Sequence, residues 1–325
     1  MTKIIDFFKK SSDTRNYVIG GSIFIVMILL AVLTQNRFPY SKIALDIGAF
    51  INNIFGTDIT LTIQWYAVFI LTGLSIAAFF AYEEFKRVGW NPEWLFDGLL
   101  WAVPLSIVGS RLYYVLFDPN PSYSSFGEII NIRQGGLSIH GAVITAFIFV
   151  IFFTKKKKIN FWVLADILAI GFLIGQIVGR WGNFMNAEAY GPEIQSAFML
   201  NILPEFIKNQ MTIGGVIHHP TFLYEGLWNF AGLVFLLIAR RKRWFKVGDL
   251  MGLYLIWYGL GRGAIIEPLR TGGDPGDALR MFGLPTNIVL SLTLFMLGGL
   301  AIILAKKHFI KDQPYYVDIL VDIHD

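Results

Sequence analysis

The feature that most constrains this chain is a series of eight long apolar runs separated by short polar connections. They cover about residues 17–34, 64–82, 95–117, 139–154, 161–180, 221–239, 250–266 and 286–305. A helix needs about 20 mostly apolar residues to cross the hydrocarbon of a bilayer. Because the run at 139–154 is short, we expect its helix to begin earlier. The chain is therefore predicted to be all-α, folded as a polytopic transmembrane helical bundle.

Composition supports this fold class and excludes several others. Only 15% of the 325 residues are charged, against about 25% in ordinary soluble domains. The absence of cysteine excludes a disulfide scaffold, a thiolate metal site, an iron–sulfur cluster and a cysteine nucleophile on the chain itself. The net charge of +4 is not gathered into one stripe, so nucleic acid is not expected as a partner.

The distribution of Lys and Arg predicts the orientation of the bundle. Of the 27 such residues, 18 lie in one set of alternating segments, six lie in the opposite set, and three lie within or at the ends of runs. The positive-inside rule places the richer set, which includes both termini, in the cytoplasm. The first run has a longer apolar core than a signal peptide and lacks a cleavage site after it, so we expect a retained helix.

Polar and ionisable side chains gather at the ends of runs that this topology places at the outer interface. They are Tyr66, Arg111, His140, Arg180, Asn183, Asn186, Glu188, His219, Glu225, Arg262 and Glu267. Ionisable groups within a membrane are costly and usually have a partner or a function. The six runs from 64–82 to 250–266 are therefore expected to converge on one polar chamber.

Several of these residues also have an ordinary interpretation. Tyr66 beside Trp65 is typical of an aromatic belt at the membrane interface. A lone His140 is consistent with a solvated interfacial residue, and Arg111 and Arg262 could extend to the lipid headgroups. No metal site is expected, since the adjacent pair at 218–219 lacks the spacing that places two ligands on one helix face.

One segment is not explained by these ordinary interpretations. Residues 179–191 read Gly-Arg-Trp-Gly-Asn-Phe-Met-Asn-Ala-Glu-Ala-Tyr-Gly, at a membrane boundary. Glycine allows close approach of the backbone to a ligand or a left-handed turn, and amides supply donors and acceptors for an oxygen-rich headgroup. Arginine supplies a planar fork that matches phosphate or carboxylate. The segment predicts a site for a lipid headgroup or another anion.

This segment resembles the signature of bacterial prolipoprotein diacylglyceryl transferases, Gly-Arg-x-Gly-Asn-Phe-x-Asn-x-Glu-x-x-Gly, and contains it in full. Further family-like motifs, in order along the chain, are Trp65-Tyr66, Gly109-Ser110-Arg111-Leu112, the His140 motif at 135–141 and His219-Pro220-Thr221-Phe222-Leu223-Tyr224-Glu225. The resemblance covers about residues 60–305 and implies seven family-like spans plus one extra N-terminal span. It divides the chain into an N-terminal segment (1–60), a transferase body (61–305) and a cytoplasmic tail (306–325).

The seventh family-like span departs from the family pattern. The family commonly places Glu four residues after Arg, whereas Arg262 and Glu267 are five apart. Two explanations remain open. Either one inserted residue forms a π-bulge, or the helix ends early at Gly263.

The resemblance implies a transferase of lipoprotein biosynthesis in the bacterial cell membrane, with its active site toward the outer leaflet. Its partners would be the lipid bilayer, phosphatidylglycerol and preprolipoprotein signal peptides with a lipobox cysteine. The diacylglyceryl group would pass to the cysteine thiol as a thioether, with release of glycerol phosphate. The reaction needs no redox cofactor, nucleotide or metal.

The resemblance and the chemistry together suggest a role for each residue. His140 is the expected base for the thiol, with Tyr66 as an alternative. Arg180 and Arg262 are expected to stabilise the leaving phosphate, with Arg111 as a third donor. The remaining candidates for substrate binding are Asn183, Asn186, Glu188, Gly191, Glu225 and Glu267. Glu188 and Glu267 are expected to hold an arginine in place.

Two other functions are less consistent with the sequence. A transporter or channel for a small anion could use the same arginines, but transporters usually contain repeated halves and a midplane site, and no repeat is visible. An intramembrane hydrolase would require a Gly-x-Ser-x-Gly motif or paired intramembrane Asp residues, which the sequence lacks. Residues 1–40 precede every motif, so they are expected to be dispensable for the chemistry.

Overall fold

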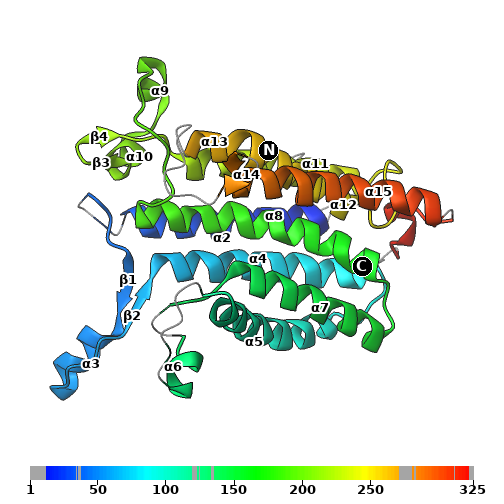
Figure 1. Ribbon diagram of the computed structural model, residues 1–325, viewed down its shortest axis with the longest axis horizontal. Coiled ribbons are helices and arrows are strands. Elements are labelled where there is room, and N and C mark those ends of the chain that lie inside the picture. Colours follow the sequence, from blue (N-terminus) through cyan, green and yellow to red (C-terminus); the bar gives the residue numbers. More distant parts are fainter. Residues whose placement is uncertain are drawn as a thin grey trace, which may run out of the picture. The chain divides into compact units, whose positions relative to one another are not determined.

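The computed structural model describes residues 12–33, 35, 38–118, 123, 125–132, 135–270, 280–281, 283–310 and 312–321. The chain forms two compact units, one made of residues 1–80 with 168–318 and the other of residues 81–167 with 319–325. Two long helices, α4 (Trp65–Arg87) and α8 (Phe161–Asn186), contribute residues to both units. Figure 1 shows the helices and labels them.

The first unit holds most of the other elements. They are α2 (Ser12–Leu33), β1 (Ile43–Asp46), α3 (Ile47–Phe55), β2 (Thr62–Gln64), α9 (Ala197–Ile202), α10 (Glu205–Gln210), β3 (Thr212–Ile213), β4 (Val216–Ile217), α11 (Thr221–Ala239), α12 (Asp249–Leu260), η1 (Gly261–Ile266), α13 (Glu267–Arg270), β5 (Arg280–Met281), β6 (Leu284–Pro285), α14 (Thr286–Leu290), η2 (Ser291–Leu297), α15 (Gly298–Phe309) and η3 (Tyr316–Ile319, whose last residue belongs to the second unit). The strands form three antiparallel pairs, β1–β2, β3–β4 and β5–β6. The second unit adds α5 (Glu93–Leu116), α6 (Phe126–Ile130) and α7 (Ile139–Lys157).

The predicted fold class is confirmed. Among the described residues, six helices are long and apolar enough to cross a membrane, namely α4, α5, α7, α8, α11 and the continuous helix Thr286–Phe309. The first predicted span corresponds to α2, whose described apolar stretch Val18–Leu33 is shorter. The run at 250–266 lies in a composite helix formed by α12, η1 and α13 without interruption. The chain is a multi-pass helical membrane protein.

The start of α7 differs from the expectation. The helix begins at Ile139, so the expectation that it begins earlier is wrong. Gly135 and Gly136 have φ angles of 88° and 70°, which a right-handed helix cannot contain. Ser138 is extended, with φ −97° and ψ 125°. The helix instead gains length at its other end, where it runs to Lys157.

The composite helix resolves the Arg262–Glu267 spacing. Residues Gly261–Ile266 are π-helical, and the helix continues to Arg270 without ending at Gly263. A π-helical segment accommodates one extra residue in a turn, so Arg262 and Glu267 remain on neighbouring turns. The prediction of a π-bulge is therefore confirmed, and the alternative of an early end is wrong.

Helix α8 is buried over much of its length. Its apolar side chains Ala169, Ile170 and Leu173 are fully buried. A Cβ at Gly73 of α4 would lie 3.2 Å from the Cβ of Val178 and 3.3 Å from the Cα of Gly175, so glycine at position 73 allows α4 to approach α8 closely. Within lipid the hydrophobic effect does not drive helices together. Small residues at the interface instead allow close van der Waals packing.

The N-terminal helix packs against the residues of the signature motif. The ring of Phe24 on α2 contacts Trp181 edge-on, with ring centroids 6.1 Å apart. The following segment is anchored at Tyr40, which is 5% exposed and whose N–H donates to Gln210 Oε1 at 2.7 Å. Gln210 Nε2 in turn donates to the carbonyls of Phe184 and Met185. Removal of residues 1–40 is therefore expected to disturb the end of α8, contrary to the expectation from the sequence that these residues are dispensable for the chemistry.

We expect Gln210→Leu to lower the thermal stability of the purified protein by several degrees. The substitution removes the acceptor of a buried N–H and the donor to two carbonyls, and each buried group left unsatisfied costs about 1–3 kcal/mol. The measurement is thermal unfolding in detergent. Gln195→Leu, an exposed position in the same region, should be silent, and an equal melting temperature for both variants would contradict the proposed anchor.

The C-terminal segment docks on the connection between α11 and α12. Tyr316 is 1% exposed, and its N–H donates to the carbonyl of Phe245. Arg243 pairs with Asp318 at 2.8 Å. On the neighbouring helix α15, which runs beside α12 (Figure 1), Lys306 pairs with Asp249 at 3.2 Å. These contacts hold the ends of α12 and α15 together.

Candidate active site

The signature motif begins on the last turns of α8 and leaves the helix through two left-handed residues. Ala187 and Ala189 have φ angles of 49° and 54°, a conformation that non-glycine residues rarely adopt. Between them lies Glu188, whose Oε1 accepts a hydrogen bond from Asn183 Nδ2 at 2.8 Å. The hydroxyl of Thr221, at the start of α11, donates to the carbonyl of Ala189. The turn is therefore held by both its own motif and the next span.

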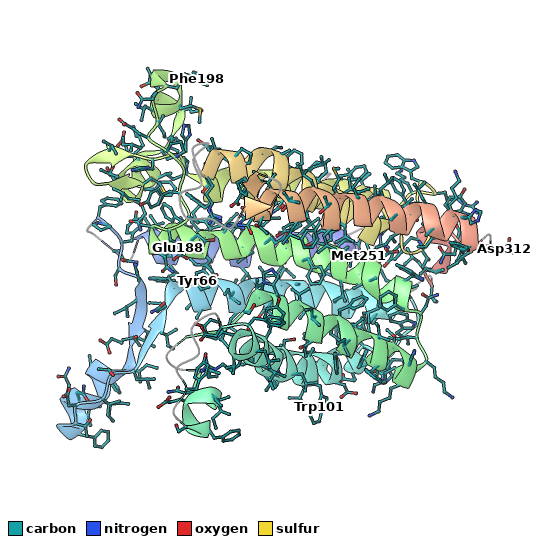
Figure 2. All side chains as sticks on the ribbon, in the orientation of Figure 1. Tyr66, Trp101, Glu188, Phe198, Met251 and Asp312 are labelled. Carbon is teal, nitrogen blue, oxygen red and sulfur yellow. The ribbon has the colours of Figure 1, made fainter. Side chains whose placement is uncertain are left out.

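Two glycines of the motif are required by close packing. A Cβ at Gly182 would come within 2.7 Å of Tyr66 Cδ2, and Figure 2 labels Tyr66 and Glu188 at the same end of the first unit. A Cβ at Gly191 would lie 2.9 Å from His219 Cβ and 3.1 Å from the carbonyl of Leu269. These glycines bring α4, α8 and α11 together at the motif.

Five charged residues from α8, α11 and the composite helix form a connected ion-pair cluster. Arg180 Nη2 of α8 lies 2.5 Å from Glu225 Oε1 of α11. The other oxygen of Glu225 lies 3.2 Å from Arg262 Nη1 in η1. Arg262 Nη2 reaches Glu267 at 3.2 Å, and Glu267 also lies 3.8 Å from Arg270 Nη1. We call Arg180, Glu225, Arg262, Glu267 and Arg270 the arginine cluster.

The arginine cluster carries more positive than negative charge. Its three arginines and two glutamates have a formal net charge of +1. The carboxylates are buried, at 5% and 3% side-chain exposure for Glu225 and Glu267, whereas the arginines retain 15–34%. A buried carboxylate requires a partner, so the glutamates fix the guanidinium groups while part of each stays accessible. The arrangement suits a singly charged anion.

The helices that bear the cluster are fixed by a pair of tryptophans. Trp228 and Trp257 stack with centroids 4.3 Å apart, and each indole N–H donates to the carbonyl of the other residue. Gly232 and Gly261 lie against these rings, where a Cβ would collide with Trp257 and Trp228 respectively. The indole pair therefore sets the spacing of α11 and the π-helical segment.

Sequence reasoning missed two residues at the cluster. Tyr258, one turn before Arg262, interacts electrostatically with Arg180, Arg262 and Glu225. Arg270, one of the six basic residues in the segments opposite the richer set, pairs with Glu267. Their spacing along the helix could have identified both residues. Tyr258 is four residues before Arg262, and Arg270 is three residues after Glu267, so each lies on the same helix face as its neighbour.

The second unit contains Arg111, which holds a loop. Its Nε donates to the carbonyl of Ile129 and its Nη2 to that of Glu128, both at 2.7 Å. Its Nη1 donates to the carbonyls of Gly135 and Gly136 at 3.1 and 3.0 Å. Four hydrogen bonds to backbone carbonyls thus organise the segment that leads into α7.

His140 lies in the first turn of α7, in the same unit as Arg111. Its ring is exposed and stacks on Tyr113 of α5 with centroids 5.9 Å apart. The helices α5 and α7 lie side by side (Figure 1), since Gly109 and Gly141 face each other without side chains. The accessible imidazole is compatible with proton transfer.

The adjacent histidines before α11 have different partners. His218 Nδ1 lies 2.8 Å from the carbonyl of Gly191, and His219 Nδ1 lies 3.0 Å from the hydroxyl of Tyr224. Burial and the neighbouring His218 lower the pKa of the His219 imidazole. Both rings therefore stabilise the connection between the motif and α11.

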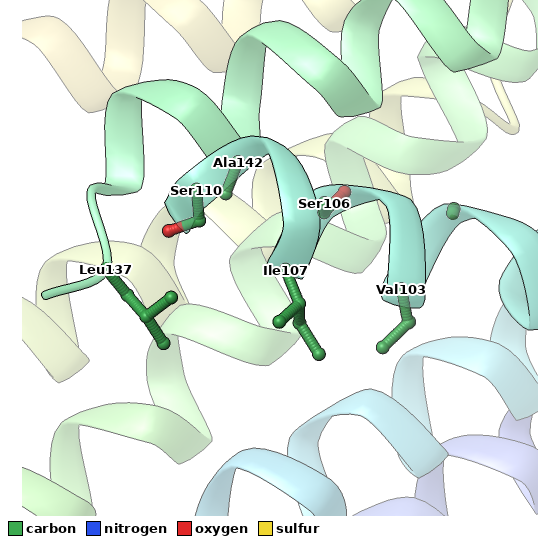
Figure 3. Close-up of a pocket in the computed structure, with 7 residues that line it drawn as sticks. Val103, Ser106, Ile107, Ser110, Leu137 and Ala142 are labelled. Carbon is green, nitrogen blue, oxygen red and sulfur yellow. The ribbon is translucent and has the colours of Figure 1, made fainter. Parts of the chain in front are cut away.

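A shallow apolar cavity of about 280 Å³ lies in the second unit (Figure 3). It is lined by Ala102, Val103, Ser106, Ile107, Ser110, Leu137 and Ala142. Ser110 is anchored through its hydroxyl, which donates to the carbonyl of Ser138 at 2.7 Å. The cavity thus lies beside the segment that leads to His140.

The structure brings together most, but not all, of the candidate residues within one unit. The first unit contains Tyr66, Arg180, Asn183, Asn186, Glu188, Gly191, Glu225, Arg262 and Glu267, and the second contains Arg111 and His140. Glu267 pairs with Arg262 as expected, whereas Glu188 pairs with Asn183. The second carboxylate that holds the arginines is Glu225.

The fold and the arginine cluster define a polytopic membrane protein with a partly buried cluster of ion-paired arginine and glutamate side chains among its helices. The family model for prolipoprotein diacylglyceryl transferase matches residues 53–304. Three relatives are each 44% identical over 254 residues, covering 78% of this chain and 92% of theirs. They are phosphatidylglycerol–prolipoprotein diacylglyceryl transferases of Bacillus mycoides, Bacillus cereus and Bacillus anthracis. The chain belongs to the prolipoprotein diacylglyceryl transferase family, and it is a transferase. Membership of this family does not favour the alternative function, a transporter or channel for a small anion.

Proposed function

We propose that this protein transfers the diacylglyceryl group of phosphatidylglycerol to the lipobox cysteine of preprolipoproteins, as the names of its relatives indicate for them. It would do so in the bacterial cell membrane, with both termini in the cytoplasm and the site toward the outer leaflet. The charge distribution along the sequence supports this orientation.

The observation that carries the proposal is the charge of the arginine cluster. A phosphodiester such as phosphatidylglycerol carries one negative charge, which balances the formal charge of +1 on the cluster. Arginine presents a planar fork of donors to phosphate oxygens. The lipid would therefore be held by its phosphate, with the transferred carbon next to it.

The reaction is a displacement at that carbon. The thiol loses its proton to a base, the sulfur forms a bond to the glycerol carbon, and the bond from this carbon to the phosphate oxygen breaks. The electron pair leaves with glycerol phosphate, on which a second negative charge develops. Fixed arginines stabilise this charge more strongly in a water-poor site than in solution. No oxidation or reduction takes place, so the step needs no redox cofactor.

The residues take the following roles in this proposal. His140 accepts the thiol proton, with Tyr66 as the alternative, and Arg180 and Arg262 stabilise the leaving group. Asn183, Asn186 and Glu188 orient the oxygens of the glycerol headgroup, and Glu225 and Glu267 hold the arginines. Gly191 allows the motif to pack against the start of α11, and Arg111 holds the segment that leads into α7. Asn186 Oδ1 is buried and has no hydrogen-bond partner among the described residues, which leaves it available to a hydroxyl.

The proposal is tested by incubating the purified protein with phosphatidylglycerol and a lipobox peptide, followed by mass spectrometry. We expect a peptide heavier by one diacylglyceryl group and an equal amount of released glycerol phosphate. A peptide with Ser in place of the lipobox Cys is the control and should remain unmodified. Absence of the adduct in a correctly folded preparation would contradict the function.

A further inference from the structure

A second set of polar side chains lies one helical turn from the arginine cluster, toward the middle of the spans. Gln176 precedes Arg180 by four residues on α8, and Asn229 follows Glu225 by four residues on α11. Residues four apart lie on one face of a helix, about 6 Å apart along its axis. The two amides therefore extend the polar site toward the hydrocarbon.

Gln176 is joined to α12 through Tyr254, whereas Asn229 follows Glu225 by one turn of α11. Gln176 Nε2 donates to the hydroxyl of Tyr254 at 2.8 Å, and Tyr254 interacts electrostatically with Glu225. Tyr254 is 7% exposed and Asn229 is 2% exposed, so this region is protected from solvent. Buried polar groups thus continue from the turn that bears the arginine cluster to the next turn of α8 and of α11.

Both amides have an unused hydrogen-bonding atom. Gln176 Oε1 and Asn229 Nδ2 are buried and have no partner among the residues that the structure describes. A tyrosine hydroxyl both donates and accepts, so Gln176 can equally present its NH₂ group by rotating its amide. An unsatisfied amide at membrane depth is costly, so these two atoms require a partner that a bound molecule can supply.

From this geometry, and resting on the proposed function, we infer that Gln176 and Asn229 bind the ester carbonyls of the diacylglyceryl group. A lipid held by its phosphate at the arginine cluster must direct its acyl chains toward the middle of the membrane. The ester groups lie between the phosphate and the chains, at the depth of these amides. Ester carbonyls only accept hydrogen bonds, which matches the NH₂ group of Asn229 and that of Gln176.

The experiment compares phosphatidylglycerol with its diether analogue, which has the same headgroup and chains but lacks both carbonyls. The parent protein should transfer from the diester lipid at least tenfold faster, measured as kcat/KM with a lipobox peptide. This comparison requires no variant, so it does not depend on the folding of an altered protein.

Variants then connect this preference to the two amides. Asn229→Leu and Gln176→Leu should lose most of the diester preference, because their transfer from the diester lipid falls while transfer from the diether lipid changes little. Any intrinsic difference in reactivity between the lipids remains in every variant and cancels. Thr293→Val, which removes a polar group from another span of the same unit, should keep the full preference.

The outcomes separate the subsite from the proposed function. Equal transfer from both lipids by the parent protein would overturn the subsite and leave the amides to bind water. The same diester preference in the parent and both amide variants would also overturn it. Absence of any adduct from either lipid would instead contradict the proposed function, and the subsite with it.

Discussion

Arg262→Lys is expected to lower transfer by about 100-fold or more at matched membrane abundance. The guanidinium of Arg262 reaches Glu225 with one nitrogen and Glu267 with another, both at 3.2 Å. A lysine offers one point charge and cannot span both carboxylates. Each lost charge-assisted hydrogen bond costs about 1.5–3 kcal/mol, or about ten- to a hundredfold in rate, and more where charge develops in the transition state.

The same reasoning applies to Arg180, which pairs with the other oxygen of Glu225. Arg180→Lys should impair transfer nearly as much as Arg180→Ala, because geometry as well as charge is lost. Arg243→Lys is the matched control, since Arg243 is 70% exposed and pairs with Asp318 in the C-terminal segment. Near-normal transfer by the Lys variants at both positions would refute the proposed role of the arginine cluster. An arginine that only extends to the lipid headgroups can be replaced by lysine without loss.

His140→Asn is expected to reduce transfer at neutral pH by about 10²-fold, the usual scale for loss of a general base. The side chain is exposed at the first turn of α7, where its ring stacks on that of Tyr113. A small polar replacement should therefore leave the fold intact. The measurement is the initial rate of adduct formation at matched protein abundance.

The pH dependence of this variant identifies the role of His140. Without a base, transfer depends on the fraction of free thiolate, so the rate should rise about tenfold per pH unit below the thiol pKa of about 8.5. His308→Asn, exposed near the end of α15, should retain the parent profile. A normal rate and an unchanged profile for His140→Asn would exclude it as the base and direct attention to Tyr66.

Much of the architecture could be predicted from periodicity and charge. Apolar runs of sufficient length have few alternatives to a helix in lipid, because every backbone N–H and C=O must be satisfied within the segment. The spacing of five residues between Arg262 and Glu267 also predicted a local feature, the π-helical segment Gly261–Ile266. The start of α7 was mispredicted because Gly135 and Gly136 are compatible with several conformations until the surrounding loop selects one.

The sequence by itself determined the class of protein, the helical spans and the residues of the signature motif, since these depend on local composition and spacing. Only the tertiary structure decided that Glu225 joins Arg180 to Arg262, because these residues lie on different helices whose approach depends on packing. The same holds for the two amides of Gln176 and Asn229. Gln176 Oε1 and Asn229 Nδ2 have no hydrogen-bond partner among the described residues. The sequence cannot show this, because only the packing of the helices buries these atoms away from water.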